Sequence, residues 1–270
     1  MIDFPENVNR FFPSPLSKAT GVCYNKSNEE RQVISMFISG LQKMTLLDYP
    51  GKIACTVFLQ GCNFRCPFCH NSDLLGRSET PFMEKEEFLS FLKGRVGLLD
   101  AVCVSGGEPT LQPDLPELLR EIKALGYKVK LDTNGNRPEI LRQLVSEKLV
   151  DYVAMDIKNS PARYGDTVGI SGFSMEKVEQ SIRFLLSGQV DFEFRTTVVA
   201  ELHDESSIRE MGQYLAGLAA PKKPQKLFLQ PFVNRDSVLL PGLTPPEPDM
   251  MEKYAQILAP YIENIAIRGQ

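Results

Sequence analysis

Three cysteines lie close together in the stretch Gly61-Cys-Asn-Phe-Arg-Cys-Pro-Phe-Cys-His-Asn71, directly after the apolar, strand-like run Ile53–Leu59. Cys62, Cys66 and Cys69 have the spacing C-x3-C-x2-C. A [4Fe–4S] cluster that is held by protein alone takes four cysteine thiolates. Because no fourth cysteine follows in this loop, the spacing predicts a cluster with one iron open to a ligand that is not protein. An open iron indicates a reactive site and not a structural one.

The aromatic Phe68 completes a pattern, Cys62-x3-Cys66-x-Phe68-Cys69, that resembles the signature of the radical S-adenosylmethionine (SAM) superfamily. Later motifs of that superfamily follow in order. The resemblance implies one [4Fe–4S] cluster on the three cysteines, SAM as the second cofactor, and a place for Phe68 beside them. A second cluster is not expected, because the sequence has no ferredoxin-like cysteine insert.

Two further stretches narrow the resemblance. Leu46-Leu-Asp-Tyr-Pro-Gly51 and Cys69-His-Asn71 are similar to the activating enzymes of glycyl-radical proteins. The likeness is greatest to the activating protein of anaerobic ribonucleoside-triphosphate reductase, with pyruvate formate-lyase activating enzyme next. It covers roughly residues 38 to 235.

Length and composition agree with one large α/β domain. The chain has 270 residues, of which 43% are apolar, and a formal net charge of −4. This balance gives no excess of positive charge for nucleic acid or membrane phosphates, so neither is expected as a partner. No apolar run approaches the roughly 18 residues of a membrane span. Six cysteines without an opening signal peptide indicate a reducing, cytoplasmic location.

Residues 1–35 differ from the rest of the chain. They show no apolar periodicity and contain Pro5, Pro13 and Pro15, which interrupt regular structure. We expect a weakly ordered N-terminal extension in which Cys23 binds nothing, followed by a radical SAM core domain at 36–270 with a C-terminal helix. Since Met36 lies just ahead of the first family-like residues, it is a candidate for the true start.

Strand and helix patterns then alternate along the chain. Six segments read as strands: Ile53–Leu59, Ala101–Val104, Lys128–Leu131, Tyr152–Ile157, Phe192–Val199 and Lys226–Gln230. Helices are expected after them, at Glu84–Lys93, Pro113–Leu125, Pro138–Glu147, Ser174–Ser187, Asp204–Leu218 and Met250–Leu258. Ser174 and Asp204 are the expected N-caps of their helices.

This alternation predicts parallel strands joined by right-handed crossovers. Leu41–Leu47 and the turn after it are expected to lead as a hairpin into the first core strand, and Ile265–Ile267 to add a short last one. Six strand–helix units are too few for a closed eight-stranded barrel, so the predicted fold is an open (β/α)6 arc, a partial TIM-type barrel. Ligands of such sheets bind at the carboxyl ends of the strands.

The first motif at a strand end is Ser105-Gly-Gly-Glu-Pro109. Its two glycines allow backbone to approach a ligand closely, and Glu108 supplies an anion beside it. The resemblance implies that Gly106, Gly107 and Glu108 hold the methionine amino group of SAM. The alternative is an ordinary Gly-Gly turn before a helix that begins with proline.

The next two strands end in Asp132-Thr-Asn-Gly135 and Asp156-Ile-Lys158. The first motif lacks the spacing of a calcium loop. By resemblance, Asp132 and Asn134 lie where SAM presents its ribose and carboxylate. The second motif matches an Asp-x-Lys in which the lysine neutralises the SAM carboxylate. Taken alone, Lys158 would be read as a solvated loop lysine.

Two residues on later strands complete the candidate cofactor-binding set. Arg195 lies within a strand, where an unpaired charge is costly to bury. It is expected either to pair with Glu108 or the SAM carboxylate, or to point to solvent. Phe232, in Gln230–Asn234, is a candidate to pack against adenine by resemblance.

Four other residues receive ordinary structural interpretations. His70 is expected to be a loop residue and not a ligand, and His203 to lie on the surface. Cys55 and Cys103, within strands, are expected to be small buried apolar residues.

The resemblance implies an oxidoreductase of anaerobic metabolism that cleaves SAM reductively to a 5′-deoxyadenosyl radical and generates a glycyl radical on a partner enzyme. A flavodoxin or ferredoxin would supply the electron. One alternative is a radical SAM enzyme that acts on a small molecule, of the 7-carboxy-7-deazaguanine synthase type. More remote alternatives are an iron–sulfur electron carrier and a zinc module, each of which requires a fourth protein ligand.

Overall fold

The structure is a computed structural model that describes residues 37–76 and 80–269. The predicted extension at 1–35, the alternative start at Met36 and the role of Cys23 lie outside the described residues.

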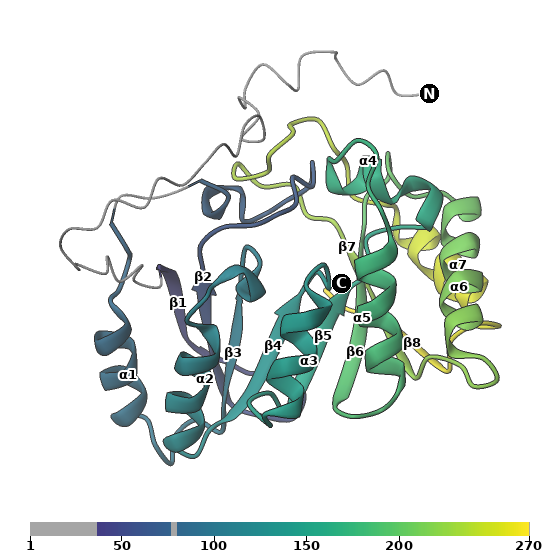
Figure 1. The fold of residues 1–270 in the computed structure, drawn as a ribbon. Coiled ribbons are helices and arrows are strands. Elements are labelled where there is room, and N and C mark those ends of the chain that lie inside the picture. Colours follow the sequence, from purple (N-terminus) through teal and green to yellow (C-terminus); the bar gives the residue numbers. More distant parts are fainter. Residues whose placement is uncertain (1–36, 77–79, 270) are drawn as a thin grey trace, which may run out of the picture. The chain divides into compact units, whose positions relative to one another are not determined.

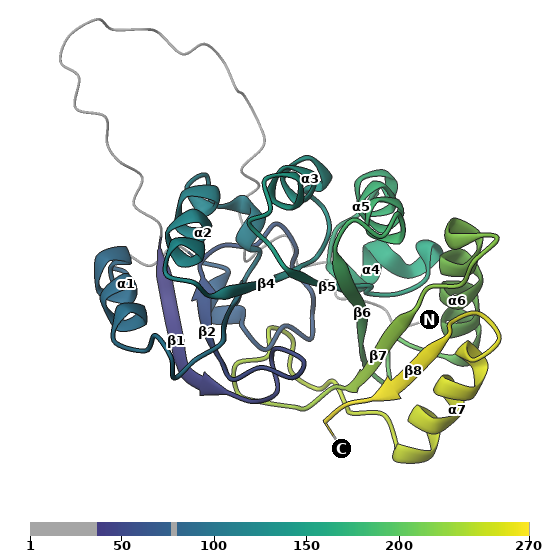
Figure 2. The same cartoon turned by 90° about the horizontal axis from the view of Figure 1, so that it is seen from below.

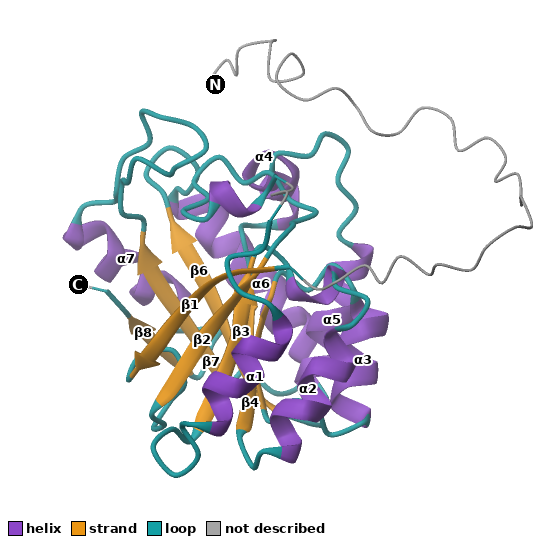
Figure 3. Ribbon diagram, turned by 90° about the vertical axis from the view of Figure 1, so that its left-hand side faces the viewer, coloured by secondary structure: helices purple, strands orange, loops and turns teal. Residues whose placement is uncertain are grey.

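The described chain forms one eight-stranded sheet in which the strands follow one another in sequence order (Figures 1 and 3). The strands are β1 (Ile38–Thr45), β2 (Ala54–Leu59), β3 (Ala101–Gly106), β4 (Lys128–Thr133), β5 (Tyr152–Asp156), β6 (Asp191–Val198), β7 (Lys226–Pro231) and β8 (Asn264–Ile267). β1 is antiparallel to β2, and every later pair is parallel. No pairing among the described strands joins β1 to β8. The predicted hairpin entry, open arc and short last strand are therefore confirmed.

The helices are α1 (Lys85–Lys93), α2 (Leu115–Ala124), α3 (Pro138–Ser146), α4 (Tyr164–Val168), α5 (Glu176–Leu186), α6 (Glu205–Ala219) and α7 (Pro248–Leu258). All but the short α4 cover the convex side of this arc (Figure 2), and α4 lies beyond the carboxyl ends of the strands (Figure 1). All but the short α4 were predicted. None of the helices in the described part is long and apolar enough to cross a membrane.

The two predicted N-caps differ in outcome. Asp204 caps α6 in a full capping box with Ser207. The N-cap of α5 is Met175 and not Ser174. The Ser174 hydroxyl still accepts a hydrogen bond from the N–H of Glu176, at 3.3 Å, so it serves the helix from one position farther out.

Side chains of a strand alternate between two faces, and here the faces differ in chemistry. The face beneath the helices is apolar and fully buried, as at Val104, Leu131 and Phe194. The concave face carries the residues between these. Cys103, Lys130 and Tyr152 lie side by side on it, as register partners on the neighbouring strands β3, β4 and β5. The fold therefore places charged side chains on the concave face of the sheet. The motifs at the carboxyl ends of the parallel strands lie together at one edge of it.

Candidate active site

The cysteine loop follows β2 at this edge. Cys66 is 8% exposed, and Cys62 and Cys69 are partly buried. All three are free thiols. The N–H of Phe64 donates to the sulfur of Cys62 at 3.4 Å, and the N–H of Cys69 donates to the carbonyl of Cys66 at 3.0 Å. The three sulfurs are thus displayed by a tight turn of the main chain.

Gly106 and Gly107, at the end of β3, pack directly against this loop. A Cβ on Gly106 would lie 2.2 Å from the carbonyl oxygen of Leu59, and one on Gly107 would lie 2.1 Å from that of Gly61. The N–H of Glu108 donates to the same Gly61 oxygen at 2.7 Å. The sequence predicted that these glycines admit a ligand. In the structure the backbone that Gly106 admits is the last residue of β2, Leu59, and the backbone that Gly107 admits is Gly61 of the cysteine loop.

Two other segments fasten the loop from the far side of the arc. The N–H of Arg65 donates to the carbonyl of Val168, at the end of α4, at 2.9 Å. Residues 232–240, here called the strap, run from β7 toward the loop above the strands (Figure 1). The N–H of Leu240 donates to the carbonyl of Pro67 at 2.9 Å. The loop therefore joins the carboxyl ends of β2, β5 and β7.

His70 makes its polar and ring contacts with the strap. The Nε2 of His70 donates to the carbonyl of Val233 at 2.6 Å, and the Ser237 hydroxyl donates to the His70 carbonyl at 2.8 Å. Phe232 stacks on the imidazole, with ring centroids 5.3 Å apart, and is fully buried. His70 thus holds the strap, which agrees with its interpretation as a loop residue. The expected contact of Phe232 with adenine stays a prediction.

Glu108 lies beneath the loop, 1% exposed. Its carboxylate accepts hydrogen bonds from the N–H of Thr110 (3.2 Å), the hydroxyl of Thr133 (2.8 Å) and the N–H of Asn134 (2.6 Å). Burial raises the pKa of Glu108, although these donors oppose the shift. The carboxylate therefore ties the end of β3 to the end of β4.

Asn134 bonds Glu108 through its backbone N–H, and its side chain points toward the cysteine loop. Its side-chain amide donates to Asn63 at 2.8 Å and lies 4.0 Å from the sulfur of Cys62. The predicted motif after β4 is therefore brought to the loop.

A charged cluster occupies the concave face beside the loop. Its members are three cations and two carboxylates from β4, β5 and β6 and the turn after β5: Lys130, Asp132, Asp156, Lys158 and Arg195. The side chains of Lys158 and Arg195 are 14% and 15% exposed. One positive charge remains in excess within the cluster, which suits a carboxylate-bearing ligand.

Arg195 has partners that the sequence did not suggest. Its Nε lies 3.0 Å from Asp156, and its guanidinium also reaches Asp132 at 3.3 Å. Of the three alternatives for Arg195, pairing with Glu108 is wrong, because Glu108 faces Thr133 and Asn134 instead. Pairing with the SAM carboxylate stays a prediction. The alternative of a solvent-facing arginine is wrong as well.

These ion pairs set the charge state of the cluster. Burial alone would raise the pKa of Asp156, but Arg195 and Lys158 hold it at about 2. Burial alone would lower the pKa of Lys158, but Asp156 raises it above its ordinary value. Both groups are therefore charged at neutral pH.

Lys158 connects the cluster to the sulfurs. Its ammonium lies 5.8 Å from the ring centroid of Phe68. Burial raises the pKa of each loop cysteine, and the charge of Lys158 opposes part of that rise. Its backbone carbonyl accepts a hydrogen bond from Nε2 of His203 at 2.9 Å. His203 is 2% exposed, so the prediction of a surface histidine is wrong. It packs under the turn that carries Lys158.

The three cysteine sulfurs of the loop are the type of donor that holds an iron–sulfur cluster. Burial raises the pKa of Cys62 to about 11 and that of Cys66 to about 12. Within the described residues, no three His, Cys, Asp or Glu side chains converge on one ion position. Thiolates on a cube each bind a different iron, so they need not converge, and thiolates are the ligands that iron–sulfur clusters select.

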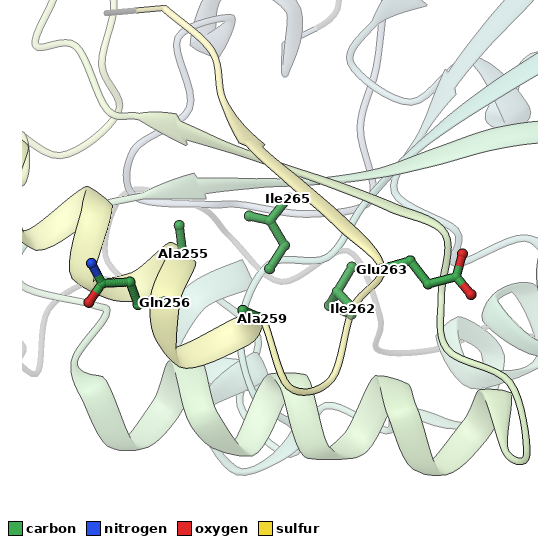
Figure 4. A pocket seen from close by; sticks show the side chains of 6 residues that line it. All are labelled: Ala255, Gln256, Ala259, Ile262, Glu263 and Ile265. Atoms are coloured by element: carbon green, nitrogen blue, oxygen red, sulfur yellow. The ribbon is translucent and has the colours of Figure 1, made fainter.

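A separate hollow of about 330 Å³ lies between α7 and β8 (Figure 4). Its lining consists of Ala255, Gln256, Ala259, Ile262, Glu263 and Ile265. None of these residues belongs to the site described above.

The pattern of the radical SAM superfamily matches residues 56–209. A relative from Methanocaldococcus jannaschii, described as a "putative glycyl-radical enzyme activating enzyme", is 33% identical over 239 residues, which are 86% of this chain and 95% of the relative. The pyruvate formate-lyase-activating enzyme of Streptococcus mutans is 28% identical over 83% of this chain and 91% of its own.

This chain belongs to the radical SAM superfamily, in the family of glycyl-radical enzyme activating enzymes. It is an oxidoreductase-type enzyme, and its cofactors are those of the superfamily, a [4Fe–4S] cluster and SAM. A crystal structure of a domain of pyruvate-formate lyase-activating enzyme from Bacteroides vulgatus has the same fold, with a TM-score of 0.51 and 21% identity over 63% of this chain and 99% of that one.

Within this radical SAM chain, the predicted site residues occupy one region around the cysteine loop. Phe232, the first residue of the strap, lies at its edge and stacks on His70. Two neighbours were missed. Lys130 is 1% exposed and pairs with Asp132 at 2.6 Å. Lys130 lies between Val129 and Leu131 in a strand. A charge within a strand is costly to bury unpaired, and the same argument selected Arg195, so it could have found Lys130 as well. Asn63 was missed because nothing in its sequence context distinguishes it.

Proposed function

We propose that the chain activates a glycyl-radical enzyme, with anaerobic ribonucleoside-triphosphate reductase as the specific partner. When bound and reduced, the cluster would supply one electron for the cleavage of a carbon–sulfur bond of SAM to methionine and a 5′-deoxyadenosyl radical, and the radical would take a hydrogen atom from a backbone glycine of the partner. A flavodoxin or ferredoxin supplies the electron, and the reaction takes place in the cytoplasm. The observation that carries the proposal is the placement of three free thiols beside a cluster with one surplus positive charge.

The chain's own residues have distinct tasks in this proposal. Cys62, Cys66 and Cys69 would hold the [4Fe–4S] cluster through their thiolates. Lys158 faces both the sulfurs and the interior of the arc, so its ammonium can attract the carboxylate of SAM. Arg195 holds the carboxylates of Asp132 and Asp156 in place, which keeps Lys158 aimed.

The residues at the end of β3 support the amino end of SAM. Gly106 and Gly107 bring that end of β3 against the loop, and Glu108 accepts hydrogen bonds there. Asn134 stands between Glu108 and Cys62. The methionine part of SAM is thus expected between the ends of β3 and β5.

The test has two stages. Anaerobically reconstituted and reduced chain should release 5′-deoxyadenosine from SAM, and alanine at Cys62, Cys66 or Cys69 should abolish this. Cys55→Ala is the control, because Cys55 is a buried free thiol that lies in β2 under the helices and not in the loop. A chain that holds no iron and sulfide, or cleaves SAM without the loop thiols, would refute the proposal.

The second stage identifies the partner. Incubation with anaerobic ribonucleoside-triphosphate reductase should produce a glycyl-radical EPR doublet on that enzyme, and incubation with pyruvate formate-lyase should not. SAM cleavage with no protein radical on either would favour a small-molecule substrate of the 7-carboxy-7-deazaguanine synthase type. No cleavage at all would leave an electron carrier or a zinc module.

A further inference from the structure

The side-chain amide of Asn134 is held in one orientation just after the end of β4. Asn134 is 6% exposed. Its Oδ1 accepts a hydrogen bond from the backbone N–H of Asn136 at 3.0 Å, and its own backbone N–H donates to Glu108 at 2.6 Å. The contact with Asn136 shows which end of the amide is the oxygen. The Nδ2 group is therefore the end that faces the cysteine loop.

This Nδ2 group meets two acceptors in the loop. An asparagine amide carries two N–H donors on its nitrogen. Here the nitrogen donates to Oδ1 of Asn63 at 2.8 Å and, in a longer hydrogen bond, to the sulfur of Cys62 at 4.0 Å. Buried donors in native proteins have acceptors, and the sulfur is the acceptor that the structure offers to the second N–H.

The sulfur of Cys62 thus receives hydrogen bonds from two segments of the chain. The N–H of Phe64 donates to it from within the loop at 3.4 Å, and Asn134 donates from beyond β4. A hydrogen bond becomes shorter and stronger when its acceptor is ionised. A cysteine that holds iron is a thiolate, so the contact with Asn134 should tighten when the loop is loaded.

We propose that the side-chain amide of Asn134 donates a hydrogen bond to the thiolate of Cys62 and thereby raises the reduction potential of the cluster. The inference rests on the cluster of the proposed function. Hydrogen bonds to sulfur help to set the potentials of iron–sulfur clusters, because a donor stabilises the more negative, reduced state. The resemblance placed Asn134 against SAM. Since both of its amide protons face the loop, the geometry assigns this side chain to the cluster instead.

The decisive variant is Asn134→Ser. The serine hydroxyl can still accept from the N–H of Asn136, as in the turns that serine forms, but it is too short to reach the loop. In anaerobically loaded protein without SAM, the ratio of reduced to oxidised cluster at a fixed potential should fall about fivefold, as for the loss of one hydrogen bond. For a one-electron couple this is a midpoint potential about 40 mV more negative.

The matched control is Asn264→Ser, the same change at the start of β8, where the amide donates to the carbonyl of Gln225. It should leave the potential unchanged. A midpoint potential does not depend on how much of the protein is loaded, so incomplete loading of a variant leaves the comparison intact.

Asn63→Ala separates the donor from a positioning effect on the loop. It removes the acceptor of one Asn134 N–H and keeps the donor to Cys62, so its shift in potential should be smaller than that of Asn134→Ser. A spectroscopic readout tests the contact itself. In protein that carries ¹⁵N only in its asparagine side chains, pulsed EPR of the reduced cluster should show a nitrogen coupling that Asn63→Ala keeps and Asn134→Ser loses.

SAM binding provides the last comparison. The Kd of SAM for the oxidised, loaded protein should stay at the wild-type value in Asn134→Ser, because the amide protons of Asn134 are already engaged by the loop. A weaker SAM affinity with an unchanged potential would overturn the inference in favour of a direct contact with SAM.

The remaining outcomes also decide the question. Equal potentials and equal nitrogen couplings in wild type and Asn134→Ser would overturn this inference alone. A shift in Asn63→Ala as large as in Asn134→Ser would also overturn it, because the position of the loop would then be the cause. A wild-type chain that holds no cluster would overturn the proposed function together with this inference.

Discussion

At the scale of single residues, the site depends on two positions that cannot carry a side chain. Gly106 has a φ of +124°, which residues with a Cβ rarely adopt, and a Cβ on it would overlap the Leu59 backbone. Gly107 has no such conformational demand, but it touches Gly61 just as closely. The glycine pair therefore serves the contact between β3 and the cysteine loop, whatever it also offers to SAM.

Gly107→Ala should displace the cysteine loop. Its new Cβ would meet backbone, which has no rotamer to relieve the overlap, so we expect a loss of about 1–3 kcal/mol in the free energy of unfolding. Iron and sulfide content after reconstitution should fall with it. Gly217→Ala is the matched control, because a Cβ on this exposed α6 residue meets nothing within 4 Å and should add about 0.5–1 kcal/mol. Urea unfolding and iron analysis provide the comparison, and full cluster loading in Gly107→Ala would contradict the close contact.

At the scale of elements, the turns after the strands position the charges, and each turn is fixed by a neighbour. The turn after β5 carries Lys158 because His203 supports its carbonyl from the start of α6. The N-terminus of α6 is in turn fixed by Asp204, whose carboxylate accepts from the N–H of Ser207 at 2.8 Å. The N-cap of α6 is thus linked to the charged cluster through His203, the residue before the cap, which bonds the carbonyl of Lys158.

Asp204→Ala should cost about 1 kcal/mol of stability at neutral pH, the usual effect of losing an N-cap. The backbone hydrogen bond from Ser207 lowers the pKa of Asp204. A carboxyl whose pKa is depressed by folding stabilises the fold above its unfolded pKa, and this contribution is lost as pH falls through the folded pKa. The difference between wild type and Asp204→Ala should therefore shrink below about pH 4. Asp204→Asn, which caps without a charge, should stay close to wild type at pH 7, and an equal loss in both variants would show that charge and not capping matters.

The sequence predicts elements better than it predicts what they touch. Alternation of apolar residues located the core strands and six helices, and the order of motifs placed the candidate residues at the strand ends. The partners of Arg195 and the burial of His203 depend on contacts between segments far apart in the chain, which no local pattern encodes. α4 was missed because five residues are too few to show a helical period. Ser174 failed as an N-cap by one position, within the usual uncertainty of helix ends.

At the scale of the whole molecule, the cysteine loop joins parts that the open sheet leaves apart. β2 and β7 do not pair, since β3 to β6 lie between them. The loop nevertheless bonds to the end of β3 through Gly61, to α4 through Arg65 and to the strap through Pro67. Within the described residues, no strand pairing closes the open arc. At the site, the two ends of the sheet are linked instead by the hydrogen bonds between the cysteine loop and the strap.

Loading the cluster should therefore stabilise the strap and α4 as well as the loop. A ligand that binds only the folded state stabilises it, by about 4 kcal/mol at a thousand times its Kd, and each kcal/mol shifts the Tm of a domain of this size by about 2–4 °C. Anaerobic loading should thus raise Tm on the order of 10 °C. Amide exchange should slow in residues 62–69, 164–169 and 232–240 together. The Cys62→Ala, Cys66→Ala, Cys69→Ala triple variant should show none of these changes under the same treatment. Slower exchange in the loop alone would mean that the strap and α4 move independently of the cluster, and the loop would then not be the point that couples the two ends of the sheet.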